Sequence, residues 1–450
     1  MTRQPIRSGL TAIGTDSYDA SAFNGKNDET YTARTIQERG TELSGALSGV
    51  RVLDLTRVIA GPAAAQMLGD LGAEVIKIER PGEGDDGRRV GHVYVGGRRE
   101  GRDVQSNYFV AFNRNKRGIT VDFTKPGGRE ILRSLAEKSD VLIENYKTGV
   151  LARYGLDYES LRKVNPALVY CSVTGYGQTG PYRERPGFDP VFQAQCGLMS
   201  VTGVPDGEPG SGPVKVGISI IDWMTGLNAA VAVLAALRER DAVSGQGQHI
   251  DLSLLECGIA AMSHAAQQFL MDGTSPVRMG IAGPGGAPIG ILECADGQLF
   301  ISVSSDAQFK RLCDVLGCPE FASDARFLTN PLRVDNRGAL LPLLSGCAKS
   351  WKAQALLEAL IDASVSAGMY NNVEGMFADP QVSARGVAVP LRHPQMPGLK
   401  VVANPLRLSR TPPAYDLAPP GLGEHTDTVL ASVLGYGPEQ IHRLREEGAI

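Results

Sequence analysis

An aspartate stands at the end of an apolar run in the segment GISIIDWMTG, residues 217–226. Asp222 follows two isoleucines and precedes Trp223, and burying a carboxylate costs free energy unless it is paired or hydrogen-bonded. A long apolar helix is expected over 223–240, and aspartate suits the N-cap of such a helix. Because a helix N-terminus also stabilises an anion, a cap and a reactive group can be the same residue. Asp222 is therefore the first candidate functional residue.

Basic residues follow the ends of the strands expected early in the chain. They are Arg57, Lys77, Arg80, Arg88, Arg89 and the three cations of NRNKRG, residues 113–118. One arginine alone in such a place is most often part of a solvated turn, but the strand ends of an open α/β sheet are where ligands bind. As a set, these cations favour a ligand that carries phosphate, because Arg and Lys suit phosphate oxygens.

The signatures of nucleotide cofactors are absent from the sequence. The first expected strand leads into RVIAGPAAAQ without G-x-G-x-x-G, and no G-x-x-x-x-G-K-[ST] occurs. The seven cysteines include no C-x-x-C pair and the six histidines are dispersed, so we expect no metal site and free thiols. The net charge of −4, with both signs interspersed, does not indicate a nucleic-acid partner.

Alternating strands and helices are expected to position these residues. RVLDLT (51–56), GPAAAQMLGDLGA (61–73) and EVIKIE (74–79) read as strand, helix and strand, which indicates parallel strands joined by a right-handed crossover. The same pattern continues with a helix over 127–140 and strands over 118–123, 141–146 and 168–177. The sequence therefore predicts an α/β protein with a doubly wound parallel sheet.

The rest of the chain predicts a second, smaller α+β domain. The expected division is an N-terminal extension over 1–45, a large Rossmann-like domain over 46–270, a small domain over 280–382 and a return to the large domain over 383–450. The small domain opens with the glycine-rich loop GIAGPGGAPIG (280–290) and a hairpin over 290–305. The N-terminus lacks the apolar core of a signal peptide, and no stretch approaches about 18 apolar residues, so we expect a cytoplasmic protein without a membrane span.

Several ordered motifs resemble those of the class III CoA-transferases, the CaiB/BaiF type. They are LDLTRVIAGPAAAQMLGDLGAEVIKIERPGEGDDGR, NRNKRGITVDF, IENYKTGVLARYGLDYESLRKVNPALVYCSVTGYGQTGP, VGISIIDWMTG, NPLRVDNR and ADPQVSARG. The resemblance runs from about residue 46 to the C-terminus. It implies an interlocked homodimer, with each active site between the large domain of one subunit and the small domain of its partner.

The resemblance also implies that Asp222 is a nucleophile. In the family, this aspartate attacks an acyl-CoA thioester to give a mixed anhydride, which the released CoA thiolate converts into an aspartyl-CoA thioester. An incoming carboxylic acid then reverses the steps. Such intermediates need a dry site, because water would hydrolyse them. Coenzyme A is then part of the substrate, and no permanently bound cofactor is expected.

Two glycines match the flexible loop that covers the active site in the family. Backbone N–H groups at Gly285 and Gly286 could approach the oxyanion and shield the anhydride. Pro284 and Pro288 depart from that pattern, because they stiffen a loop that is expected to move.

Further residues match family positions that hold the nucleotide end or the pantetheine arm of CoA. They are Arg80, Asn145, Tyr146 and Arg153. Arg57 and Ile59 stand where some relatives carry histidine and glutamine, and we count Arg57 with the CoA-site residues. Either Arg57 or Arg88 could instead hold the distal carboxylate of a dicarboxylic acid.

The family also contains α-methylacyl-CoA racemases, which use a histidine before a second aspartate. Here GFDPVFQAQCG (187–197) places Phe188 at that position, and phenylalanine cannot carry a proton. TRVIAGP, SVTGYGQTGP and PGFD resemble the branch that acts on dicarboxylates, including the succinyl-CoA–glutarate enzymes. This favours succinyl-CoA as donor and a C4–C6 dicarboxylic acid as acceptor. A 2-methylacyl-CoA racemase and a non-catalytic CoA-binding protein remain the alternatives.

Overall fold

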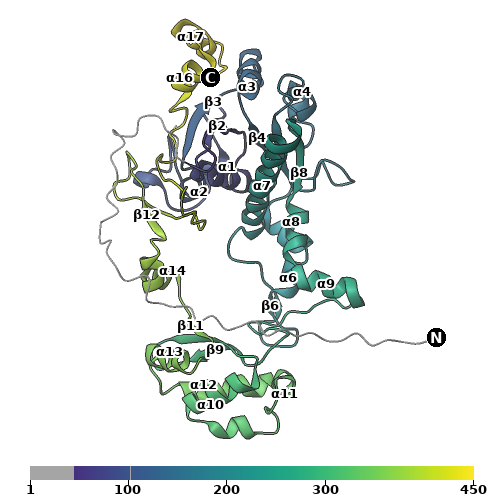
Figure 1. Ribbon diagram of the computed structural model, residues 1–450, viewed down its shortest axis with the longest axis vertical. Coiled ribbons are helices and arrows are strands. Elements are labelled where there is room, and N and C mark those ends of the chain that lie inside the picture. The colour runs from purple at the N-terminus through teal and green to yellow at the C-terminus, as the bar shows by residue number, and fades with distance from the viewer. Residues whose placement is uncertain (1–44, 102) are drawn as a thin grey trace, which may run out of the picture. The chain divides into compact units, whose positions relative to one another are not determined.

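A six-stranded parallel sheet lies at the centre of the computed structural model, which describes residues 45–101 and 103–450 (Figure 1). The strand order is β3-β2-β1-β4-β5-β8, and every neighbouring pair is parallel. The strands are β1 Arg51–Asp54, β2 Glu74–Glu79, β3 Lys116–Thr120, β4 Val141–Glu144, β5 Val169–Thr174 and β8 His249–Ser253. The predicted α/β class with a parallel sheet is confirmed. The predicted extension over 1–45 lies almost entirely outside the described residues.

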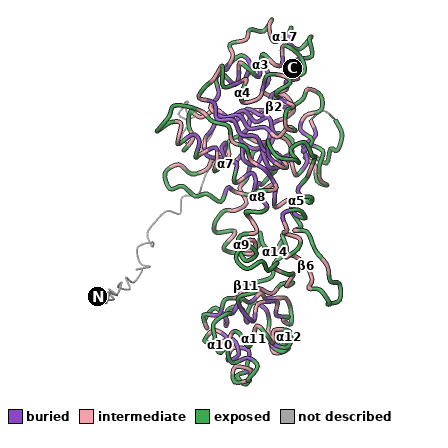
Figure 2. The backbone as a smooth tube through the Cα atoms, turned by 90° about the vertical axis from the view of Figure 1, so that its right-hand side faces the viewer, coloured by how far each residue is buried: buried purple, intermediate pink, exposed green. Residues whose placement is uncertain are grey.

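Two hydrophobic cores cover the two faces of this sheet. Leu142 belongs to one core while its neighbours Val141 and Ile143 belong to the other, because successive side chains of a strand point to opposite faces. Helices α1 (Ala60–Asp70) and α7 (Ile220–Glu239) pack in the second core. Figure 2 shows buried residues gathered along the strands. Helices on both faces are the doubly wound arrangement that the alternation of strands and helices predicts.

The other face is covered from two distant parts of the chain. Its core combines residues of α3 (Pro126–Glu137) with residues of α17 (Pro438–Glu446) near the C-terminus. The Thr426 hydroxyl accepts the backbone N–H of Thr120 in β3 at 3.1 Å. The C-terminal segment is therefore bound directly to the edge of the sheet.

Helix α7 is the long apolar helix that was expected over 223–240. The segment Ile220–Ser244 is long and apolar enough to cross a membrane by length and composition alone, and 44% of its most apolar window is buried. This measure is a mean hydropathy and tolerates the polar residues of α7, so the expectation that the chain has no membrane span stays a prediction. A core helix of a soluble fold passes the same test, and α7 packs against α1, α8 (Leu254–Ala261), β5 and β8. The cytoplasmic location stays a prediction.

A separate antiparallel sheet has a hydrophobic core of its own. It has the order β11-β10-β9, with β9 at Ile289–Glu293, β10 at Gln298–Ser302 and β11 at Ala367–Met369. The β9–β10 pair is the hairpin expected over 290–305. Its core includes residues of α10 Asp306–Leu316, α12 Arg337–Ala348 and α13 Ala353–Asp362.

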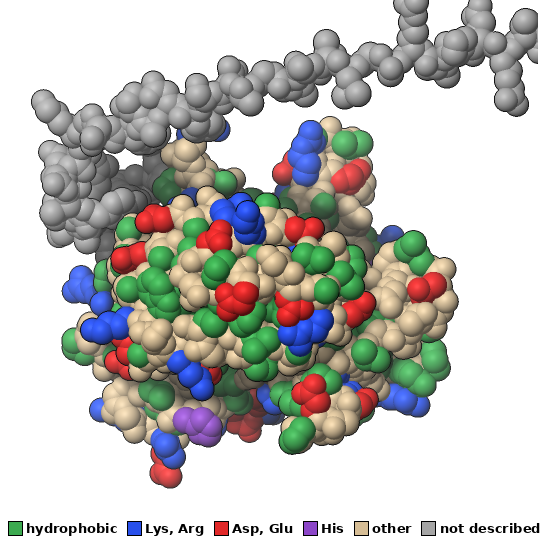
Figure 3. All heavy atoms as spheres, turned by 90° about the horizontal axis from the view of Figure 1, so that it is seen from below, with side chains coloured by type: hydrophobic (Ala, Val, Ile, Leu, Met, Phe, Trp, Pro, Cys, Tyr) green, Lys and Arg blue, Asp and Glu red, His purple; other side chains and the backbone are tan. Residues whose placement is uncertain are grey.

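Figure 3 shows one face of the molecule, where acidic and basic side chains are interspersed. The exact division into domains stays a prediction.

The remaining elements are short. The helices are α2 Asn107–Phe112, α4 Tyr158–Leu161, α5 Asp189–Gln195, α6 Leu198–Val201, α9 Ser263–Asp272, α11 Asn330–Asp335, α14 Val373–Ala378, α15 Pro380–Ala384 and α16 Thr426–Val429. The strands are β6 Gly203–Val204, β7 Gly212–Pro213, β12 Ala388–Pro390 and β13 Lys400–Val402.

Candidate active site

Asp222 lies in the first turn of α7. The helix begins at Ile220 with Ser219 as its N-cap, so Asp222 is not the cap itself. Because β8 follows α7 and runs parallel to β5, α7 begins at the edge of the sheet where the strands end. An anion in this first turn is favoured by the helix dipole. The helix therefore presents Asp222 at the edge where open α/β sheets bind ligands.

Thr225 and Gly226 explain how this first turn is held. The Thr225 hydroxyl donates to the Ile221 carbonyl at 2.8 Å. A Cβ atom at Gly226 would lie 2.7 Å from the Ala60 carbonyl oxygen and 3.1 Å from the Ala63 Cβ. Only glycine thus allows α7 to approach the start of α1 so closely. The Thr-Gly pair fixes the start of α7 beside the loop that follows β1.

The carboxylate of Asp222 has no hydrogen-bond or ion-pair partner among the described residues. Burial, together with the negative charge of Asp189, raises its pKa to about 7. A buried structural carboxylate normally has partners that compensate its charge. An uncommitted carboxylate with a perturbed pKa at a strand-end edge is a candidate nucleophile.

The loops after β1, β2 and β4 bring Arg57, Arg80 and Tyr146 together. The Arg57 guanidinium carbon lies 5.0 Å from the centre of the Tyr146 ring. Burial raises the pKa of the Tyr146 hydroxyl, and the charges of Arg57 and Arg80 act against this rise. Arg80 is exposed and pairs with Glu83. These side chains form a cationic and aromatic surface that suits an anionic ligand.

Asn145 holds the backbone of Arg57 at this surface. Its Oδ1 accepts the Arg57 N–H at 3.0 Å, and its Nδ2 donates to the Arg57 carbonyl at 2.9 Å. The next residue, Val58, has a φ of 71°, which is unusual for a β-branched residue, and its N–H donates to Asp85 at 3.0 Å. The chain thus fixes Arg57 from both sides, a positioning role for Asn145 that sequence reasoning missed.

Arg153 lies near the same aromatic surface. It belongs to the 3₁₀ turn Leu151–Tyr154, where Tyr154 packs edge-on against Phe123 at a ring separation of 5.2 Å. Phe123 in turn packs against Tyr146 at 5.4 Å. The Arg153 side chain is exposed and has no ion-pair partner within the described chain.

The glycine-rich loop is held by the NPLRVDNR segment. Asn330 accepts the Ala287 N–H at 3.1 Å and donates to the Gly285 carbonyl at 3.2 Å. Arg333 donates to the Ala287 carbonyl at 2.8 Å, and Arg337 to that of Gly283 at 3.2 Å. This clamp was not foreseen from the sequence, although both segments were singled out there.

Gly285 and Gly286 differ in what the fold demands of them. A Cβ at Gly286 would lie 3.0 Å from the Ser304 Cβ, so packing explains this glycine. A Cβ at Gly285 would meet nothing within 4 Å, and its φ is not in the left-handed region. Nothing in the described part of the chain therefore requires glycine at 285.

These observations agree with the family to which the sequence belongs. Residues 47–426 match the model of CoA-transferase family III. The chain belongs to this family.

Named relatives cover nearly the whole length of this CoA-transferase. A succinate–glutarate CoA-transferase of Agrobacterium fabrum is 43% identical over 387 residues, which are 86% of this chain and 95% of that protein. The succinyl-CoA:glutarate CoA-transferase of Homo sapiens is 38% identical over 404 residues, 90% of each chain. A crystal structure of a CAIB/BAIF family protein from Brucella suis is 43% identical, with a TM-score of 0.79, and the match covers 87% of this chain and 100% of that chain.

Half of the predicted cationic set of this CoA-transferase is structural. Lys77 pairs with Asp85 at 2.8 Å, Lys116 with Asp54 at 2.7 Å, and Arg114 with Asp70 at 2.6 Å. All of these side chains are buried. The prediction that the set as a whole favours phosphate was therefore wrong for these members, because their charges are already compensated inside the protein.

Arg88 is also committed to the interior. Its guanidinium donates to both carboxylate oxygens of Glu79, at 2.7 and 2.6 Å, and lies 3.8 Å from the centre of the Phe109 ring. The side chain is fully buried. The hypothesis that Arg88 holds a substrate carboxylate is wrong, and Arg57 is left as the arginine for that role. Among the described residues, no cluster of three or more metal-ligating side chains occurs.

Proposed function

We propose that this family III CoA-transferase moves CoA from succinyl-CoA to a dicarboxylic acid through covalent intermediates on Asp222. The observation that carries the proposal is the Asp222 carboxylate, which is uncommitted, partly buried and placed where strands end. The names of the Agrobacterium and human relatives supply the substrate class, since both pair a succinyl donor or succinate with glutarate.

The proposed reaction starts at the thioester carbonyl carbon. An Asp222 oxygen forms a bond to this carbon, the carbon–sulfur bond breaks, and CoA thiolate leaves a succinyl–aspartyl anhydride. The thiolate then attacks the aspartyl carbonyl, releases succinate and forms the aspartyl-CoA thioester. The acceptor carboxylate attacks this thioester to give a second anhydride, and the released thiolate attacks its acceptor carbonyl. The acceptor leaves as its CoA thioester, and Asp222 returns as carboxylate.

Mass spectrometry after incubation with succinyl-CoA tests this mechanism. The expected result is a CoA or succinyl adduct on Asp222 that hydroxylamine removes and that is absent in Asp222→Asn. Asp251→Asn is the control, because Asp251 is an exposed carboxylate that accepts the backbone N–H of Gln178 and forms no hydrogen bond with Asp222. Turnover with an unmodified Asp222 would overturn the mechanism. Proton exchange at the α-carbon of a 2-methylacyl-CoA in heavy water, without an acceptor acid, would favour the racemase instead.

The proposal includes a homodimer in which the glycine loop of one subunit covers Asp222 of the other. Helix α9 has no buried residue, and Phe269, Leu270 and Met271 are 51%, 76% and 78% exposed. Phe188 is 75% exposed beside Asp189. Apolar surface of this kind is typical of an interface. A monomeric mass in analytical ultracentrifugation at assay concentration would exclude the dimer.

Arg57 is the residue that we propose for the distal carboxylate of the dicarboxylic substrate. Its side chain is 33% exposed, its Nη1 lies 3.2 Å from Asp86, and its Nε is buried without a partner among the described residues. A carboxylate would satisfy this fixed guanidinium by a charge-assisted hydrogen bond. The phosphates of CoA could use the same group, so the test must separate the two.

Substrates with and without a distal carboxylate make that separation. For Arg57→Gln we expect kcat/KM to fall about 10- to 100-fold with succinyl-CoA and to change little with butyryl-CoA, because a hydrogen bond to a charged group contributes about 1.5–3 kcal/mol. Equal losses with both thioesters would assign Arg57 to a phosphate. Arg80→Gln is the matched control, because Arg80 is an exposed arginine of the same surface. Unchanged kinetics for Arg57→Gln would remove the proposed role.

A further inference from the structure

We infer that Asp189 and Gln193 are positioning residues for the nucleophile, fixing both the start of α7 and the charge that Asp222 experiences. The inference rests on the proposed function of Asp222, but it concerns residues that do not touch the reacting atoms. Both side chains are buried, at 3% and 0% exposure.

Asp189 binds the first turn of α7 from a separate helix. Its Oδ2 accepts the backbone N–H of Ile221 at 2.7 Å and that of Asp222 at 3.1 Å. These are two of the N–H groups that a helix start leaves unpaired, and Ser219, the N-cap, has no side-chain capping bond of its own. Asp189 therefore supplies the missing cap from a position 32 residues away.

Gln193 joins this cap to the segment that leads into α7. Its Nε2 donates to Asp189 Oδ1 at 2.5 Å and to the Ile218 carbonyl at 3.2 Å, while its Oε1 accepts the Val216 N–H at 2.8 Å. Asp189 and Gln193 are four residues apart and thus share one face of α5. One face of α5 therefore forms hydrogen bonds both with the segment before α7, at residues 216 and 218, and with the first turn of α7, at residues 221 and 222.

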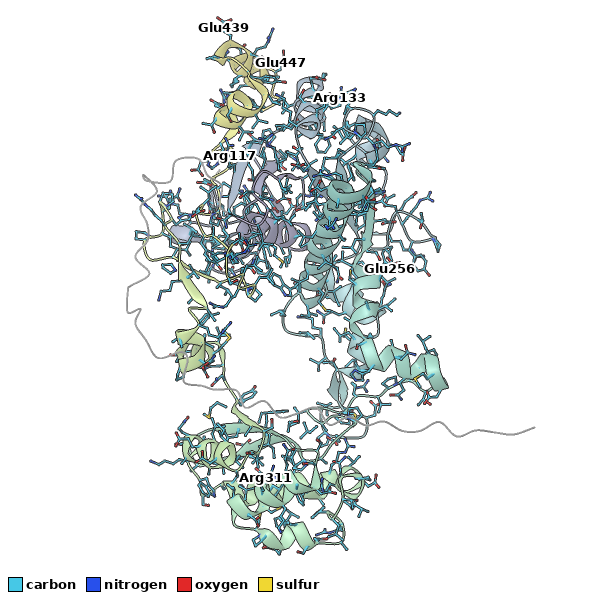
Figure 4. All side chains as sticks on the ribbon, viewed as in Figure 1. Arg117, Arg133, Glu256, Arg311, Glu439 and Glu447 are labelled. Atoms are coloured by element: carbon cyan, nitrogen blue, oxygen red, sulfur yellow. The ribbon has the colours of Figure 1, made fainter. Side chains whose placement is uncertain are left out.

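Asp189 is the source of the charge that acts on Asp222. On the elements packed against α7, the other titratable groups are paired, neutral or exposed to water. Asp70 of α1 pairs with Arg114, and Glu256 of α8, labelled in Figure 4, accepts the Ser253 hydroxyl at 2.7 Å. Burial raises the pKa of Cys196, Cys257 and Cys171, which keeps these thiols neutral. His249 and Asp251 of β8 and Tyr170 of β5 do not contribute to the rise of the Asp222 pKa.

The arrangement makes Asp222 a more basic carboxylate than a helix start alone would. The N–H groups that would stabilise the Asp222 anion are taken by Asp189, and the two like charges repel. A more basic carboxylate is a stronger nucleophile once it is ionised, at the cost of ionising only at higher pH. Asp189 thus sets the balance between reactivity and the pH range of activity.

The pH dependence of kcat/KM in Asp189→Asn tests this inference. Asparagine keeps a side-chain oxygen for the helix N–H groups and removes the charge. We expect the acid limb to move to lower pH by about 0.5–1 unit, and the rate on the high-pH plateau to fall about two- to tenfold. Asp251→Asn serves as the control for loss of a backbone-bound carboxylate elsewhere, and its limb should not move.

Gln193→Leu separates position from charge. It keeps Asp189 but removes the bonds to residues 216 and 218, so the plateau rate should fall while the acid limb stays in place. If Asp189→Asn does not fold, Asp189→Ser, whose hydroxyl also accepts helix N–H groups, tests the same shift. An unmoved limb in the charge-removing variant overturns the inference while the adduct on Asp222 persists. Loss of the adduct from the unaltered protein would instead contradict the proposed function.

Discussion

Two groups of buried acidic side chains in this protein are treated in opposite ways. Asp54 lies beneath the sheet edge, with Lys116 Nζ at 2.7 Å and Lys77 Nζ at 3.9 Å, and Lys77 also pairs with Asp85 at 2.8 Å. Burial alone would raise the pKa of Asp54, but the two lysines lower it to about 2. Among the described residues, the charge that acts on Asp222 is another carboxylate, that of Asp189, and burial and this charge raise the Asp222 pKa to about 7. The charges of the Asp54 group stabilise the fold, whereas the Asp222 carboxylate remains available to react.

The difference teaches how to recognise a functional charge in this fold. In the Asp54 group each charge has a partner of opposite sign, and the Lys116 ammonium donates also to the Pro62 carbonyl and to Asn113. Such full compensation is what makes burial of ions tolerable. The Asp222–Asp189 pair lacks it, so its cost must be offset by packing elsewhere. The presence of a partner of opposite charge, more than burial, distinguishes the Asp54 group from the Asp222–Asp189 pair.

Removal of one partner from the compensated group should have the largest effect on stability. Lys116→Met leaves Asp54 buried with hydrogen bonds from Thr56 and with Lys77 as the remaining cation, at 3.9 Å. We expect the free energy of unfolding to fall by about 3–5 kcal/mol. Chemical denaturation at pH 7 measures this change. Arg117→Met is the control from the same strand, because its pair with Glu74 is partly exposed. A loss for Lys116→Met no greater than for the control would contradict the contrast between the two groups.

Removal of the uncompensated charge of Asp222 should raise the free energy of unfolding. The folded state holds the Asp222 proton up to a pKa of about 7, against 3.8 for the ordinary group, so this residue lowers stability as pH rises from 4 to 7. The cost is complete above pH 7 and absent below pH 4. For Asp222→Asn we expect a gain of about 1–3 kcal/mol at pH 8 that vanishes at pH 4.

Thermal or chemical unfolding at both pH values measures this gain. Asp251→Asn again provides the comparison, because the Asp251 carboxylate is exposed to water in the folded protein. A loss of stability at pH 8 in Asp222→Asn would mean that the carboxylate has a favourable partner after all, and the distinction between the two groups would disappear.

Sequence reasoning recovered the parts of this contrast that are local. Apolar runs gave the strands of the parallel sheet, and the position of Asp222 after two isoleucines marked it as unusual. It failed where the partner is distant along the chain. Arg88 looked available because Glu79 and Phe109 approach it only in the folded protein. Asp189 was passed over because the groups that it binds are backbone N–H groups, which no residue type reveals.

The smallest effect on stability is expected for an exposed ion pair in the loop that follows β2. Arg80 and Glu83 form an ion pair with side chains 59% and 68% exposed. Water screens both charges with or without the partner, so Glu83→Gln should change the free energy of unfolding by less than about 0.5 kcal/mol. Denaturation at low and at high salt measures this, and the small effect should shrink further as salt rises. A loss of several kcal/mol would show that pairing stabilises this edge even in water, and burial would then not be what makes compensation matter at Asp54.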